Sequence, residues 1–155
     1  MIREKKKLGE LLLEQELINE EKLELGLRDQ ASTKERIGEA LVRLGLISEE
    51  DLIKTLSKQL GLPYLPLSEY PKIFPENIDP PVKFMKQYKV FPLGVYDNKM
   101  KVAINDPLDT YALDALRLAS GRELDLYIST EKDILDAVEQ FFGKGSSKME
   151  RIIEG

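Results

Sequence analysis

Two sets of residues with the same chemistry stand 29 positions apart in this chain. Each set joins a cation, a glycine and a side-chain amide: Lys7, Gly9 and Gln30 in the first, Arg36, Gly38 and Gln59 in the second. A cation attracts a phosphate, and an amide both donates and accepts hydrogen bonds. A glycine leaves the backbone bare for a flat ring or a phosphate. The pattern therefore predicts two half-sites for a ligand that is itself two-fold, with two bases and two phosphates.

These residues belong to a longer repeat, residues 7–30 and 36–59. The two copies are identical at 10 of 24 positions. Most shared positions are apolar or acidic, as expected for core and helix-start positions, so duplication of a packing unit explains much of the repeat.

Each member of the sets also has a purely structural interpretation. Gly9 and Gly38 fall inside helices, where glycine costs about 0.5–1 kcal/mol relative to alanine, and close helix–helix approach would explain them. Gln30 and Gln59 could bond to nearby backbone, and a cation at a helix start usually faces solvent. The recurrence of all three types together favours the ligand-binding interpretation.

Composition excludes several functions. The chain has no His and no Cys, which excludes thiol nucleophiles, Ser-His-Asp triads and Cys/His zinc sites. The spacing of a phosphate-binding loop is absent, and no carboxylate pair stands out from the helix-start acids, so we expect no catalytic residues, no metal and no cofactor. The net charge of −5 argues against nucleic-acid binding. No apolar run reaches the roughly 20 residues of a membrane span, which predicts a cytoplasmic protein without membrane insertion.

Helix signals surround the two motifs. Asn19 and Ser48 each precede acidic residues and are predicted N-caps. Leucines four residues apart follow each cap, and shorter apolar patterns precede it, which indicates two helix-turn-helix units. We therefore expect a four-helix subdomain over residues 1–62.

The remainder reads as a smaller mixed domain. Six of the eight prolines lie in residues 63–81, which predicts an extended connector. Residues 82–143 are expected to form an α/β subdomain with a sheet of three strands or slightly more, and residues 144–155 a linker. The expected order is a helix capped by Asp79 that runs to about Tyr88, then a hairpin turning at Asp97-Asn98. A helix ending at Gly121, a strand at 123–128 and a helix capped by Thr130 follow. The fold class is therefore α+β.

The motif spacing resembles a known family. Two copies of a 24-residue motif, separated by the five residues "ASTKE", are similar to the N-terminal cyclic-di-GMP-binding domain of type II secretion and type IV pilus assembly ATPases. The resemblance covers residues 7–143. It implies a non-catalytic regulatory module that binds cyclic di-GMP and folds with a small α/β subdomain.

The resemblance also implies which residues line the ligand. They are Lys7, Leu8, Gly9, Leu23, Leu27 and Gln30 of the first motif and Arg36, Ile37, Gly38, Leu52, Leu56 and Gln59 of the second. The leucines 23, 27, 52 and 56 would contact the guanines. Asp106, in "AINDPLD", could accept two N–H bonds from a guanine edge.

Two departures from the family pattern fall in the first motif. Lys7 replaces an arginine, and Glu16 replaces the glycine that the second motif keeps as Gly45. Gly45 stands where a helix often ends in a left-handed residue, which Glu16 would adopt under strain. These departures keep a second hypothesis open: a docking module with a degenerate site that holds the ATPase to an inner-membrane platform protein. In either case the resemblance implies a motor domain elsewhere in the full-length protein and a location peripheral to the inner membrane.

Overall fold

The computed structural model describes residues 6–73 and 82–143. The chain divides into two compact units, Met1–Leu62 and Pro63–Gly155. The first is helical and the second combines helices with a three-stranded sheet, which confirms the predicted α+β class. The predicted cap at Asp79 and the linker 144–155 lie outside the described residues.

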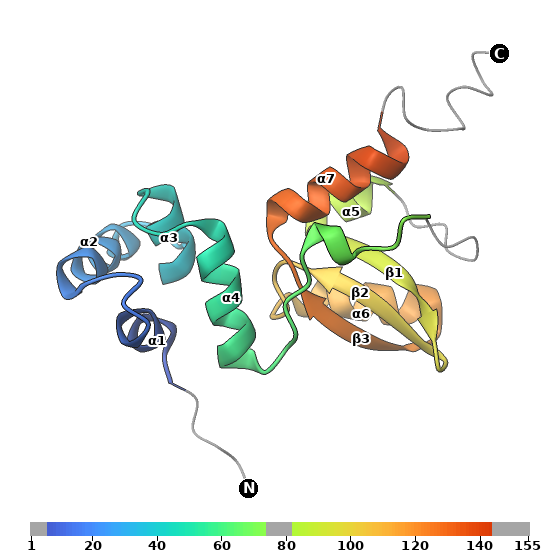
Figure 1. The fold of residues 1–155 in the computed structure, drawn as a ribbon, viewed down its shortest axis with the longest axis horizontal. Helices are drawn as coiled ribbons and strands as arrows, with labels where there is room; N and C mark the ends of the chain where they lie inside the picture. Colours follow the sequence, from blue (N-terminus) through green and yellow to red (C-terminus); the bar gives the residue numbers. More distant parts are fainter. Residues whose placement is uncertain (1–5, 74–81, 144–155) are drawn as a thin grey trace, which may run out of the picture. The chain divides into compact units, whose positions relative to one another are not determined.

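The described residues of the first unit form four helices (Figure 1): α1 Leu8–Glu14, α2 Glu20–Ala31, α3 Ile37–Arg43 and α4 Glu49–Leu60. The predicted caps are confirmed, because the Asn19 side chain accepts the Lys22 N–H and the Ser48 side chain accepts the Asp51 N–H. These bonds satisfy donors that the first helical turn leaves without partners.

The core of the first unit repeats with the sequence. Leu12 and Leu41, equivalent positions of the two motifs, are completely buried, and Ile18 and Ile47 are buried beside them. The long helix α2 packs mainly on α3, where Leu41 lies against Gly26, and the long helix α4 packs mainly on α1. The two motifs thus share one core, and the strongest helix contacts cross from one motif to the other.

The second unit is built on strands β1 Val90–Tyr96, β2 Lys99–Ile104 and β3 Glu123–Ile128, in the order β1-β2-β3. The antiparallel β1–β2 hairpin turns at Asp97 and Asn98, both at positive φ, as the sequence predicts. Helix α6 Thr110–Ser120 connects β2 to the parallel strand β3 and ends at left-handed Gly121.

Two further helices and a connector complete this unit. They are α5 Val82–Tyr88, α7 Glu131–Phe142 and the short 3₁₀ helix η1 Leu67–Glu69. The predicted cap of α7 is confirmed, because Thr130 accepts the Asp133 N–H at 3.0 Å. Figure 1 shows α6 behind the sheet, and α5 and α7 on its other side. Phe91 and Val102, both fully buried, lie in the core between these layers.

Candidate functional site

The two motif glycines lie against leucines of their own motifs. A Cβ added to Gly9 would come within 3.2 Å of Leu23 Cδ1, and one added to Gly38 within 2.7 Å of Leu52 Cδ1. Contacts below about 3.0 Å require the neighbour to move, so glycine at 38 allows close approach of α3 and α4. Helix packing therefore explains the glycines, and a ligand contact at these positions stays a prediction.

The starts of the two motifs meet in one cluster, which we call the motif junction: Lys6, Leu8, Gly38, Leu52 and Gln59. The position of a Gly38 Cβ lies 3.1 Å from Leu8 Cδ2, so the first motif reaches the glycine of the second. The Gln59 side-chain amide donates a hydrogen bond of 3.0 Å to the carbonyl oxygen of Lys6. The fold thus brings the end of the second motif to the beginning of the first.

The two predicted phosphate-binding cations occupy equivalent positions. Lys7 and Arg36 are the N-cap residues of α1 and α3, with φ/ψ of −68°/150° and −73°/156°. Both are exposed. Their carbonyls accept the N–H groups of Leu11 and Ala40 at 3.1 Å each. The repeat therefore holds both cations at the surface in the same local conformation.

The predicted apolar contacts differ between the two motifs. Leu52 is buried and Leu23 and Leu56 are half-buried, whereas the Leu27 side chain is 49% exposed. Leu27 therefore offers the largest open apolar surface of the four leucines to a flat ring. Gln30 and Ile37 are half-buried.

The ends of α1 and α3 confirm the predicted equivalence of Glu16 and Gly45. Both residues have left-handed backbone, with φ of 60° and 74°. The backbone hydrogen bonds around them also match. The N–H of Glu16 donates to the Leu13 carbonyl, as the N–H of Gly45 does to the Val42 carbonyl. The N–H of the next residue then donates to the Leu12 carbonyl in the first motif and to the Leu41 carbonyl in the second. Since glycine adopts this conformation freely and other residues do not, Glu16 is a strained position on the first motif.

Asp106 belongs to the second unit, where it has a local role. Its Oδ1 accepts the N–H of Leu108 at 3.0 Å in the turn before α6. This bond uses one of the two carboxylate oxygens. Contact of Asp106 with a guanine stays a prediction.

An ionic cluster that the sequence pattern does not reveal ties α2 to α3. The Arg43 guanidinium pairs with Glu35 at 2.7 Å and with Asp29. Hydrogen bonding to Glu35, and then to Asp29, raises the pKa of Arg43. These residues lie 8 and 14 positions from Arg43, so no short-range pattern reveals the cluster.

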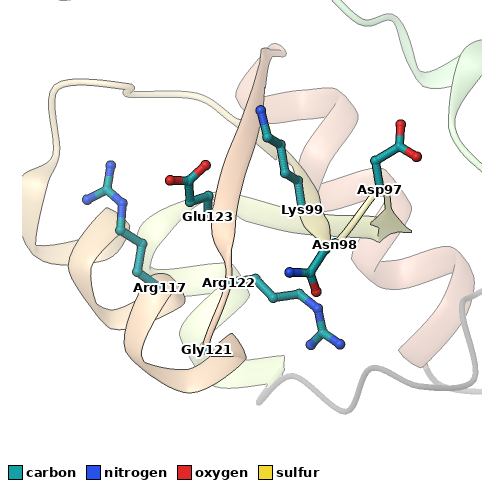
Figure 2. Close-up of a pocket in the computed structure, with 7 residues that line it drawn as sticks. All are labelled: Asp97, Asn98, Lys99, Arg117, Gly121, Arg122 and Glu123. Carbon is teal, nitrogen blue, oxygen red and sulfur yellow. The ribbon is translucent and has the colours of Figure 1, made fainter.

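The second unit has a shallow hollow of about 480 Å³ that no sequence motif indicates. Figure 2 shows its lining residues: Asp97, Asn98, Lys99, Arg117, Gly121, Arg122 and Glu123. The guanidinium groups of Arg117 and Arg122 point to different sides, and Arg117 pairs with Asp114 at 3.0 Å. Its three cations are accompanied by Asp97 and Glu123, and Asp114 neutralises Arg117, so the hollow carries little net positive charge and is a poor candidate for a nucleotide site.

A second hollow, of about 240 Å³, lies on the sheet beside Lys101. The Lys101 ammonium lies 5.0 Å from the ring centre of Tyr96 and 5.1 Å from that of Tyr127. Its interaction with the Tyr127 hydroxyl raises the pKa of Lys101. A lysine held between two aromatic rings stabilises the exposed end of the sheet.

The acidic side chains and the helices of the described residues bear on metal binding and on membrane insertion. Within residues 6–73 and 82–143, no three acidic side chains are grouped so that they could hold a metal ion. Over the same ranges no helix is both long and apolar enough to cross a membrane.

Comparison with known proteins identifies the class. Residues 60–148 match the MshEN domain, and the chain belongs to this family. A solved structure of MshE with cdg superposes with a TM-score of 0.70 at 29% identity, covering 88% of this chain and 99% of that one. The N-terminal domain of XpsE superposes with a TM-score of 0.75 at 30% identity, covering 92% of this chain and 100% of that one.

The curated relatives are parts of larger machines. The chain is 35% identical over 108 residues to type II secretion system protein E of Xanthomonas campestris, covering 67% of this chain and 19% of the relative. It is 30% identical over 148 residues to the type IV pilus assembly ATPase PilB of Myxococcus xanthus, covering 95% of this chain and 26% of the relative. The chain thus spans about a fifth to a quarter of these relatives and corresponds to a domain of secretion and pilus ATPases.

Proposed function

We propose that this chain is a non-catalytic regulatory module that binds cyclic di-GMP through its two motifs. The observation that carries the proposal is the motif junction, where Leu8 contacts Gly38 and Gln59 bonds to Lys6. A ligand with two identical halves needs two similar half-sites within its own length. The cdg ligand named for the MshE structure, which we take to be cyclic di-GMP, is consistent with this chemistry.

Each half-site would use the same three chemistries. The cations Lys7 and Arg36 would bind phosphates, the glutamines would bond to polar edges, and the exposed Leu27 side chain would contact a guanine face. Leu8, Gly9, Leu23, Ile37, Leu52 and Leu56 would complete the apolar lining, and Asp106 would accept from a guanine edge. The Gln59 amide must exchange its bond with the Lys6 carbonyl for a bond to the ligand.

Titration calorimetry with cyclic di-GMP tests the proposal, with GTP as the control for a general purine or phosphate affinity. We expect saturable heat with cyclic di-GMP and none with GTP. The variant Gln59→Leu, which removes the amide while keeping most of the volume, should weaken binding. Absence of heat with cyclic di-GMP for the folded parent chain would refute the proposal.

The chain would carry no chemistry of its own. We propose that its partners are the ATPase motor domain of the same full-length protein and an inner-membrane platform protein, which would place it at the cytoplasmic side of that membrane. ATP and GTP incubated with the purified chain should not be hydrolysed above a buffer blank. Turnover that persists after contaminating ATPases have been excluded would contradict this expectation.

A second function, docking without a nucleotide, is favoured by one specific observation. The first motif carries Lys7 in place of arginine and a strained Glu16, so its half-site departs from the second. A module of this kind would hold the motor to the platform protein. A parent chain that binds the platform protein and shows no heat with cyclic di-GMP would support docking and exclude the first proposal.

A further inference from the structure

The outer edge of β3 has backbone groups directed away from the sheet. Ser129 N–H donates inward to the Ile104 carbonyl at 3.1 Å, whereas Ile128 N–H donates outward to the Pro63 carbonyl at 2.8 Å. Because alternate residues of a parallel strand bond to the same neighbour, Leu126 and Leu124 also direct their N–H and C=O groups outward. Within the described residues of the second unit, 63–73 and 82–143, the structure provides no hydrogen-bond partner for these groups.

The end of this edge already accepts a strand. Tyr64 forms a parallel bridge with Ile128, and Leu65 N–H donates to the Ile128 carbonyl at 2.9 Å. The connector then turns into η1, so this pairing covers the Ile128 position alone. The edge is therefore shaped for strand pairing and is open at Leu124 and Leu126.

Burial agrees with an open edge. Val102, Ala103 and Ile104 of the central strand have no exposed surface. On β3, Ile128, which lies opposite Ile104 and is covered by the connector, is completely buried. Residues 124–127 of this strand are half-buried. The side of β3 away from β2 therefore leaves part of these side chains uncovered.

The pairing between β2 and β3 separates two kinds of side chain. Leu124 and Leu126 lie opposite Met100 and Val102, which makes one face of the sheet apolar. On the other face Glu123 and Asp125 lie opposite Lys99 and Lys101. A strand added outside β3 would meet leucines on the first face and carboxylates on the second.

We propose that the outer edge of β3 binds an extended segment of a partner protein in which apolar residues alternate with Lys or Arg. Main-chain bonds to Leu124 and Leu126 supply the attachment, as in other complexes formed by strand addition. The apolar residues of the segment extend the leucine rows, and its cations face Glu123 and Asp125. This edge belongs to the second unit, whereas the motif junction belongs to the first.

Amide hydrogen exchange, followed by NMR on the whole chain, tests the open edge. In the free protein the Leu124 and Leu126 amides should exchange at least about tenfold faster than those of Asp125 and Tyr127, which bond inward. Equal protection of all four amides would show that the edge is already covered and would overturn the proposal.

A short acetylated peptide in which Lys and Val alternate serves as the probe of the partner. At saturation it should slow exchange at Leu124 and Leu126 by about tenfold or more. The same peptide with every main-chain amide N-methylated, which cannot donate those bonds in either strand direction, should leave exchange unchanged. No slowing by the Lys peptide, or equal slowing by the N-methylated one, would overturn the proposal.

Charge specificity is tested with matched variants. Glu123→Gln with Asp125→Asn should weaken binding of the Lys peptide by about three- to tenfold, and added salt should weaken binding to the parent. Asp114→Asn with Glu139→Gln removes the same charge from helices of the same unit and should leave affinity unchanged. A Glu–Val peptide that binds as well as the Lys peptide would contradict the charge argument.

Discussion

The strained end of α1 predicts that replacing Glu16 by glycine stabilises the protein. Glu16 has φ of 60°, a left-handed conformation that costs a residue with a Cβ roughly 1–2 kcal/mol. Its side chain is exposed and has no hydrogen bond or ion pair with any described residue. The substitution Glu16→Gly therefore removes strain without removing a contact.

The expected gain is smaller than the strain. Glycine has more conformational freedom in the unfolded chain than glutamate. Folding therefore costs glycine about 0.5–1 kcal/mol more conformational entropy, which offsets part of the relieved strain. The difference leaves a net stabilisation of about 0.5–1 kcal/mol. For a unit of this size, 1 kcal/mol corresponds to a shift in Tm of about 4–8 °C.

The equivalent residue of the second motif supplies the matched control. Gly45 has φ of 74°, and a Cβ added there would meet no atom within 4 Å. Gly45→Ala therefore introduces conformational strain without a clash and should cost about 1 kcal/mol or more. The two substitutions together separate the backbone effect from packing.

Urea denaturation followed by circular dichroism measures both variants beside the parent. The midpoint should rise for Glu16→Gly and fall for Gly45→Ala, with the slope m unchanged in each. A clear fall for Glu16→Gly would refute the reasoning, because it would mean that the carboxylate stabilises the folded state by more than the strain costs. An unchanged midpoint for Gly45→Ala would show that a left-handed residue at this turn carries no penalty.

Three further predictions concern packing, binding and the hairpin. Gly38→Ala should destabilise the chain by about 1–3 kcal/mol, since the new methyl group would overlap a leucine, whereas Gly9→Ala has more room and should cost less. Urea midpoints that fall equally for both would contradict this order. If cyclic di-GMP binds, calorimetry should show that Arg36→Ala loses about 2–3 kcal/mol of binding free energy and Lys7→Ala about 1 kcal/mol. Lys7→Arg should bind the ligand more tightly than the parent chain. A larger loss for Lys7→Ala would reverse the asymmetry. Asn98→Gly places glycine, the residue preferred at the second position of this hairpin turn, where φ is positive, and should raise the melting temperature. A lower melting temperature would show that the asparagine side chain makes a stabilising contact.

The elements of the fold were predictable because local chemistry determines their ends. Asn19, Ser48 and Thr130 accept N–H groups three residues ahead, and Gly121 ends α6 in a left-handed conformation. The turn at Asp97 is similarly local. Each depends on residues close in the chain, so side-chain type and spacing suffice to predict it.

Within the candidate site, the sequence determined which positions are equivalent, and the tertiary structure decided what touches them. The offset of 29 predicts that Glu16 and Gly45 share a conformation, and they do. The contact of Leu8 with Gly38 and the bond from Gln59 to Lys6 join residues 30 and 53 positions apart. Such contacts depend on how the helices pack, which periodicity alone does not specify.

The sheet shows the same division. The hairpin turn at Asp97-Asn98 and the segment 123–128 predict three strands, but the parallel pairing of β2 with β3 depends on the path of α6 across the sheet. That path places Glu123 beside Lys99 and directs the Leu124 and Leu126 N–H groups outward. Strand formation is encoded within each segment, whereas the identity of the edge strand, and so the surface open to a partner, depends on packing between segments distant in sequence.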